Sequence, residues 1–297
     1  MKLRLSLKNS ARRVLLISSL LTLSLFSPGC SSSTSPTYLK ETVDSAIREI
    51  CKKEYNLDVI THRIGETVWV YIPVQDLLIK RDKPEKIFKT FEIEKLDGEF
   101  LDKSLRLEYS IKNIPRTEED EEYKFNEKMM DKFGDVWKTI RRVLFSTQHQ
   151  KEGQPKFFCT ILVDTKKGIG IRTIAYYEDI KKVSYELISY DEYQHRSIQD
   201  VFEDAQMVGD EEGARVTYFD VTMKDFVAAQ IYHRIKLKFQ KPEADKNADI
   251  DKEILKIVVY VFKTYNFGDF DAVDVNNTAS GYKVNFNKPA ILEKKPD

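Results

Sequence analysis

The chain has 297 residues, 48 basic and 48 acidic side chains, 41% hydrophobic residues, 11 glycines and 9 prolines. This length is enough for one large or two ordinary domains, and the composition excludes a disordered or repetitive stalk. Residues 1–29 contain five basic side chains and no acid, so the remainder has 43 basic against 48 acidic side chains, a net charge of −5. Because nucleic acids are bound largely through Lys and Arg, nucleic acid is not expected as the main partner.

Residues 1–29 have the organisation of a secretory signal peptide. A basic start, MKLRLSLKNSARR, leads into an apolar run over 14–26, the order of the n-region and h-region of exported proteins. This run of thirteen residues is shorter than the roughly 20 residues that span a bilayer as a helix, so an uncleaved transmembrane anchor is the weaker interpretation. The sequence therefore predicts export across a membrane.

Gly29-Cys30 and the Ser-rich stretch that follows, SSSTSPT, resemble the end of a bacterial lipobox and its tether. Ser27 and Pro28 depart from the family pattern, which has Leu and then a small residue at these places. The resemblance implies a lipoprotein with an acylated Cys30 as its first mature residue and a tether over 30–37. Ordinary signal-peptidase cleavage is the alternative, since Ser27 and Gly29 are small. Acylation also avoids a free thiol on a loose tail.

Three segments of the mature part repeat one pattern, an amphipathic helix followed by two strands. In the first region, 38–115, a helical period covers 39–50, and strands over 56–63 and 66–73 are expected to turn at Gly65. Residues 87–113 alternate as two further strands, which form an insert in this region.

The second region, 116–241, opens with a capping-box pattern at 117–120 that predicts the start of a helix running to 144. Strands are expected over 156–164 and 170–177. An insert then supplies helical structure over 178–200, a strand over 214–219 and a helix over 221–239, capped by Asp220 or Thr222.

The third region, 242–297, has the cleanest helical period, over 250–265 after Asp249, followed by strands over 270–276 and 282–287. Polar residues 240–247 are the candidate linker before it. The fold class predicted for the whole chain is α+β, with largely antiparallel sheets packed by amphipathic helices. The three α-β-β units arise either by internal duplication or by chance in a generic α+β chain.

Metal and thiol chemistry has little support in the sequence. The histidines, at 62, 149, 195 and 233, lack metal-ligand spacing, and no cofactor is expected. Asp269, Asp271 and Asp274 lack the Gly and the closing Glu of a calcium loop, so exposed strand carboxylates are expected. Cys51 and Cys159 fall on predicted buried faces, which favours two separate core thiols over a disulfide.

The densest polar group is the run 191–196, DEYQHR, in which Glu192 and His195 could serve general acid-base chemistry. A solvated helix face with i, i+4 charge pairs has the same appearance and is the preferred interpretation. No Gly-x-Ser-x-Gly or dinucleotide loop is present. We therefore assign no catalytic residue and expect no enzyme.

The strand that contains Trp69 and Tyr71 has large apolar residues on both faces. Either it is a central strand covered on both sides, or these two aromatic residues line an exposed recognition groove. The second interpretation makes Trp69 and Tyr71 candidate binding residues.

The predicted function is that of a lipid-anchored cell-envelope protein, facing the periplasm or the exterior, that acts by binding or scaffolding. Its expected partners are the membrane, through the lipid on Cys30, and another envelope protein or a ligand. The alternative is an envelope hydrolase whose site is assembled from residues distant in sequence, with Glu192 and His195 as the first candidates.

Overall fold

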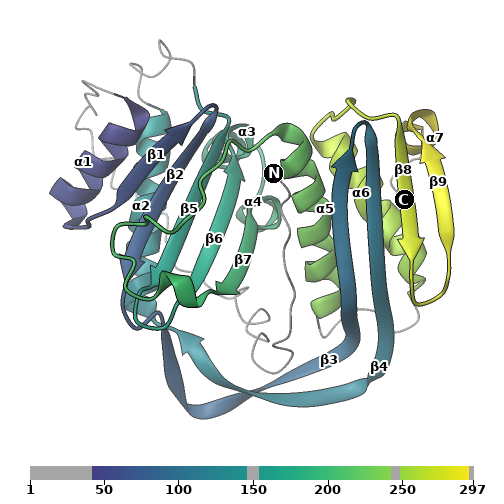
Figure 1. The fold of residues 1–297 in the computed structure, drawn as a ribbon, viewed down its shortest axis with the longest axis horizontal. Coiled ribbons are helices and arrows are strands. Elements are labelled where there is room, and N and C mark those ends of the chain that lie inside the picture. Colours follow the sequence, from purple (N-terminus) through teal and green to yellow (C-terminus); the bar gives the residue numbers. More distant parts are fainter. Residues whose placement is uncertain (1–41, 146–153, 242–247, 294–297) are drawn as a thin grey trace.

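The computed structural model describes residues 42–145, 154–241 and 248–293. Two β-sheets, each with its own helices, make up this part of the chain, which confirms the predicted α+β class. The predicted signal peptide and tether, 1–29 and 30–37, lie outside the described residues. Figure 1 shows the two sheets side by side with one helix, α5 (Met223–Gln240), between them.

The first sheet has the strand order β1-β2-β5-β6-β7. These strands cover Ile60–Ile64 (β1), Thr67–Val74 (β2), Phe157–Asp164 (β5), Ile169–Tyr176 (β6) and Ile198–Glu203 (β7). β2 and β5 are parallel, and the other neighbouring pairs are antiparallel. The hairpin at Gly65 is confirmed, because the Gly65 φ of +57° places this residue in the left-handed region that glycine tolerates.

Both faces of the first sheet are buried, because successive side chains along a strand point to opposite sides. Val68 and Val70 of β2 share one cluster with helices α1 (Val43–Tyr55) and α2 (Glu127–Leu144). Trp69 and Tyr71 belong to a separate cluster on the other face. The predicted helical stripes of α1 and α2 are thus confirmed as faces that pack against the sheet.

The second sheet has the order β3-β4-β8-β9 and is dominated by one long hairpin. Its strands cover Leu78–Leu101 (β3), Ser104–Phe125 (β4), Ala272–Asn277 (β8) and Lys283–Asn287 (β9). β4 pairs with β8 in parallel, and the other pairs are antiparallel. The hairpin starts at the first core, which contains Leu78 and Phe125, and crosses to the second sheet as a two-stranded ribbon (Figure 1).

The helix start predicted at 117–120 is wrong, because these residues belong to β4. Across the ribbon, Glu118 pairs with Lys86, and Glu119 pairs with Lys89 at 2.7 Å. The acidic run therefore pairs with lysines of β3 instead of opening a helix. Helix α2 begins instead after Asn126, whose side chain accepts a hydrogen bond from the backbone N–H of Lys128.

Three helices accompany the second sheet: α5, α6 (Ile250–Thr264) and the short α7 (Lys288–Leu292). The capping box that Thr222 forms with Asp225 confirms the predicted start of α5. Helix α5 is buried on several sides, since Phe226 packs in the first sheet's second cluster and Val227 packs against the second sheet. A helix that is apolar on several faces is typical of an interior position.

Two predictions for the insert need correction. Residues 178–200 are not continuously helical, because helices α3 (Tyr177–Ser184) and α4 (Tyr190–Arg196) are followed by β7 from Ile198. Residues 214–219 form no strand. They are part of an irregular segment, 204–222, which we call the strap. It crosses the face of the first sheet opposite α1 and α2. The candidate linker continues into 242–247, which lie outside the described residues.

Candidate functional site

Trp69 and Tyr71 are fully buried, with 1% and 0% of their surface exposed, so the exposed-groove interpretation is wrong. The strap covers both side chains. The Trp69 indole Nε1 donates to the Phe219 carbonyl at 2.7 Å, and the Tyr71 hydroxyl donates to the Asp210 carbonyl at 2.5 Å. Each buried aromatic residue thereby satisfies its polar group on the strap backbone.

Carboxylates fix the strap at two more points. Asp220 Oδ1 accepts from the backbone N–H of Glu66 and from the Thr67 hydroxyl, both at 2.9 Å. Asp210 accepts from two backbone N–H groups inside the strap, those of residues 214 and 215. The strap passes so close to Tyr71 that a Cβ on Gly213 would lie 2.9 Å from its ring. These contacts define a fixed cover, which leaves no groove over the two aromatic residues.

Glu192 makes the expected i, i+4 ion pair with Arg196 on a helix that has no buried residue, but its side chain is half-buried in a wider ion network. Its Oε1 accepts from Arg196 Nε of the same helix at 2.7 Å, from Arg234 Nη2 of α5 at 3.2 Å and from the Tyr260 hydroxyl of α6 at 2.6 Å. The Glu192 side chain is 27% exposed. Two of these partners are distant in sequence, so the i, i+4 pattern alone does not reveal them.

The same network continues to helix α3. Arg196 Nη1 donates to Asp179 Oδ1 at 2.9 Å, and the Asp179 side chain is 1% exposed. Burial raises the pKa of Asp179, although the Arg196 charge and hydrogen bond oppose this. Burial also opposes ionisation of Glu192, but hydrogen bonds from Tyr260 and Arg196 outweigh it and lower the Glu192 pKa. The network thus joins α3, α4, α5 and α6.

The pKa values of two histidines of this region, His195 and His233, are lowered. Burial, followed by the charges of Lys241 and Arg234, lowers the pKa of His195. Burial lowers the pKa of His233 to about 3. His195 is in contact with α5 through its backbone, since its carbonyl accepts from Gln230 Nε2 at 2.6 Å. The structure thus places Glu192 and His195 on one helix, while the contacts of the Glu192 carboxylate bind it to neighbouring helices.

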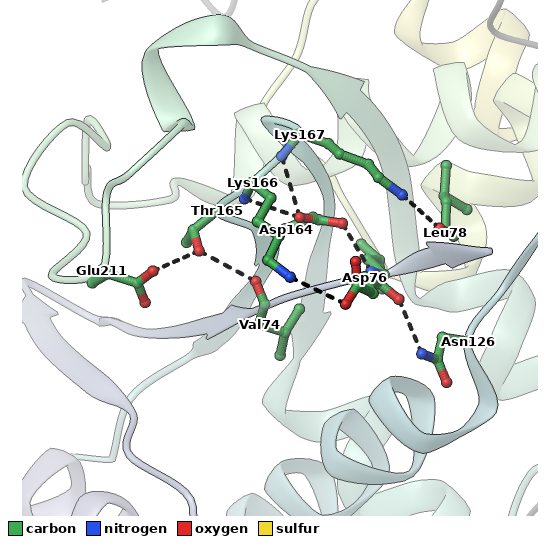
Figure 2. A network of polar contacts seen from close by, with 10 residues as sticks. Val74, Asp76, Leu78, Asn126, Asp164, Thr165, Lys166, Lys167 and Glu211 are labelled. Carbon is green, nitrogen blue, oxygen red and sulfur yellow. Dashed lines mark hydrogen bonds and ion pairs between the residues drawn. The ribbon is translucent and has the colours of Figure 1, made fainter.

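A second polar network lies where the ribbon leaves the first sheet (Figure 2). The buried Asp164 carboxylate accepts from the backbone N–H groups of Leu77, Lys166 and Lys167 at 2.9 to 3.2 Å. Lys167 Nζ donates to the Leu78 carbonyl at 2.8 Å. These bonds tie the β5–β6 turn to the first residues of β3, so Asp164 positions the base of the ribbon.

The remaining candidate residues are placed as follows. Cys30 lies outside the described residues. Cys51 and Cys159 are buried free thiols, which confirms the prediction of two separate core cysteines. The Asp269 side chain is 58% exposed, as expected for a surface carboxylate. Within residues 42–145, 154–241 and 248–293, no cluster of three or more His, Cys, Asp or Glu side chains is arranged to hold a metal ion.

Four exposed apolar residues, which we call the aromatic patch, lie at the end of α2 (Phe145) and from the end of α3 to the start of α4 (Tyr185, Leu187 and Tyr190). Tyr185 and Leu187 are 61% and 72% exposed, the highest values among the large apolar residues that the structure describes. Phe145 ends α2 and Tyr185 ends α3, and their rings meet edge to face at 5.3 Å between centroids. Exposed apolar residues that gather in this way mark interaction surfaces.

The backbone after α3 presents this patch outward. Glu186 has a φ of +57°, and the Leu187 N–H donates to the Lys182 carbonyl at 2.8 Å, the geometry of a Schellman helix end. In that motif the residue at the Leu187 position ordinarily packs on the turn before it. Here the facing residue is Lys182, so Leu187 remains exposed.

The sequence reasoning missed the aromatic patch and the Asp164 network. The signal for the patch was the stretch 185–190, YELISY, which sits between two short helices and has no helical or strand period. The signal for Asp164 was an acid directly before the turn Thr165–Gly168, where Asp commonly bonds to backbone N–H groups.

Comparison with protein-family models, with curated proteins and with solved structures gives no match for this chain. Among the helices that the structure describes, none combines the length and the apolar character needed to cross a membrane.

Proposed function

We propose that this chain is a lipid-anchored cell-envelope protein that acts by binding, with the aromatic patch as its contact surface. The observation that carries the proposal is the exposure of Tyr185 and Leu187, together with the contact between the Tyr185 and Phe145 rings. Tyr and Phe are enriched in the cores of protein interfaces, where they exclude water around a few strong contacts. The anchor in this proposal is the lipid expected on Cys30.

The partner that we favour is another envelope protein that offers apolar side chains to the patch. Two exposed carboxylates, Glu186 and Asp191, flank Leu187 and Tyr190. Together with Lys182, which faces Leu187, they give this surface charges of both signs, and a surface without a single cluster of basic side chains suits a protein partner better than an anionic membrane.

The hydrolase with Glu192 and His195 receives less support from the geometry. Glu192 Oε1 accepts hydrogen bonds from Arg196, Arg234 and Tyr260, and these bonds hold the carboxylate between α4, α5 and α6. Its contacts are those of a residue that joins helices.

Photo-crosslinking in the native envelope tests the proposal. A photoreactive residue at Leu187 of the full chain is expected to give one discrete protein adduct, and the same residue at the exposed Tyr282, in the turn before β9, serves as the matched control. A Tyr185→Ser change is expected to reduce the Leu187 adduct without lowering the amount of folded protein. Adducts with lipid alone, or equal adducts from both positions, would contradict the proposed protein partner.

A further inference from the structure

A surface hollow of about 490 Å³ lies at the start of α5, next to the loop between α6 and β8. Its lining includes Tyr176, Met223, Lys224, Tyr265, Phe267 and Asp269. Tyr176 ends β6 of the first sheet, whereas Phe267 and Asp269 precede β8 of the second. The hollow therefore opens between elements of both sheets, and its volume falls in the range of small-molecule sites.

Aromatic rings form the apolar part of the hollow. The Tyr176 and Tyr265 rings lie 6.0 Å apart in an edge-to-face arrangement, and both contact the buried Phe226 at 5.8 and 5.1 Å between centroids. Phe226 is fully buried, so the Tyr176 and Tyr265 rings rest on a residue of the core. A flat ring system stacks well on such a preformed aromatic surface.

The polar part of the hollow contains one ion pair, Lys224 with Asp269, and two further lysines lie near it without lining the hollow. Lys224 Nζ lies 3.1 Å from Asp269 Oδ2, and Lys103 Nζ lies 4.0 Å from Oδ1 of the same carboxylate. Lys288 Nζ donates to the Gly268 carbonyl next to it. Three ammonium groups thus surround one carboxylate, and together they lower the pKa of Asp269, led by the hydrogen bond from Lys224.

The α5 N-terminus does not supply this anion site. Its N-cap residue Thr222 and its third residue Asp225 bond to each other's backbone N–H groups. The attraction for an anion comes instead from the lysine side chains, above all Lys224, which lines the hollow and is one-third exposed.

We propose that this hollow binds a small organic anion, a flat ring system with a carboxylate or similar acidic group, its ring on Tyr176 and Tyr265 and its acid beside Lys224. The acidic group would compete with Asp269 for the Lys224 ammonium. This site is separate from the aromatic patch, so it does not depend on the function proposed above.

Calorimetric titration of the full chain with 2-naphthoate tests the proposal, with 2-naphthylmethanol as the uncharged control ligand. We expect the acid to bind more tightly than the alcohol. Lys224→Gln is expected to weaken naphthoate binding about threefold and Asp269→Asn to tighten it about threefold, because an exposed charge contributes up to about 1 kcal/mol. Lys283→Gln, an exposed lysine on β9, is the matched control and is expected to leave the affinity unchanged.

A second measurement locates the ligand. The ¹³C-labelled methyl group of Met223 is expected to shift on titration, and Met223→Leu assigns its signal. Absence of binding, equal affinity for acid and alcohol, or shifts that spare Met223 would overturn the proposal. A Leu187→Ser change in the aromatic patch is expected to leave naphthoate affinity intact, so failure here is distinguishable from failure of the proposed function.

Discussion

The Tyr260 hydroxyl donates to Glu192 Oε1 at 2.6 Å, although the two residues lie 68 positions apart in the sequence. This bond connects α4, which lies beside the first sheet, to α6 of the second sheet's core. Arg234 of α5 reaches the same oxygen at 3.2 Å and stacks over the Tyr260 ring at 4.5 Å from its centroid. The orientation of the two sheets therefore depends partly on one carboxylate.

Glu192→Gln is expected to destabilise the protein at neutral pH and to make its stability less sensitive to acid. The folded-state pKa of Glu192 lies below its usual value of about 4.5. A depressed carboxyl pKa stabilises the fold above the unfolded-state pKa, and this contribution is lost as pH falls through the folded-state pKa. The melting temperatures of wild type and Glu192→Gln, measured between about pH 7 and about pH 3, are expected to converge at the acid end.

Asp179→Asn is the comparison for this effect, because the Asp179 pKa is raised and its pH dependence has the opposite sign. A raised carboxyl pKa favours the folded state below the unfolded-state pKa, and this advantage is lost as pH rises. The Asn variant is therefore expected to lose less stability than wild type between acid and neutral pH. If the melting temperatures of Glu192→Gln and Asp179→Asn changed with pH in the same way, neither carboxyl group would control the pH dependence of stability.

His195→Ala is expected to leave both folding and function nearly intact, within about ±0.5 kcal/mol of unfolding free energy. His195 is half-buried, and the contact it makes with Gln230 uses its backbone carbonyl, which Ala retains. Thermal unfolding together with a cellular phenotype assay checks this. If the variant kept its melting temperature and lost the phenotype, the hydrolase alternative would replace the binding function.

Trp69→Ala is expected to cost about 3–5 kcal/mol of unfolding free energy, because a buried aromatic side chain is removed and leaves a cavity. Trp69→Phe keeps most of the ring and loses the bond to the Phe219 carbonyl, so it is expected to cost less. Urea unfolding of both variants measures the difference. A Trp69→Ala protein as stable as wild type would show that the strap does not seal this face.

Local sequence signals predicted the elements whose stabilising contacts are also local. The turn at Gly65, the start of α5 at Asp220 or Thr222 and the start of α6 after Asp249 each depend on residues within a few positions of one another. The structure confirms all three. Large apolar residues on both faces of β2 likewise indicated a central strand as one of two interpretations, and the structure confirms this one, since both faces of β2 are covered.

Features held by distant partners could not be predicted in this way. Residues 117–120 resemble a helix start, and only their pairing with β3 across the ribbon makes them a strand. Residues 214–219 alternate like a strand, but the side chains of Trp69 and Tyr71 donate hydrogen bonds to backbone carbonyls of the strap. The Glu192 network includes Arg234 and Tyr260, which lie too far from Glu192 in the sequence for any local pattern to reveal the contacts.

Cys30 is expected to be the acylated N-terminal residue of the mature protein. The basic start, the apolar run over 14–26 and the Gly29-Cys30 junction carry this prediction. Mass spectrometry of the N-terminal peptide from envelope fractions measures both the start and the added mass. Cys30→Ser is expected to release the protein from the membrane fraction, and an unmodified Cys30 or a different mature start would contradict the prediction.

Asp164→Ala is expected to cost about 3 kcal/mol of unfolding free energy, because the change leaves three backbone N–H groups without their acceptor. The N–H of Leu77 is buried, and those of Lys166 and Lys167 are part-buried. The matched control is Lys166→Ala, which removes an exposed ion pair with Asp76 at 3.3 Å and is expected to cost less than about 0.5 kcal/mol. Hydrogen exchange of the Leu77 amide, measured beside urea unfolding, is expected to accelerate in the Asp164 variant alone. If both variants were equally stable and protected, the base of the ribbon would be held by the apolar contacts of Leu78 and Phe125 rather than by Asp164.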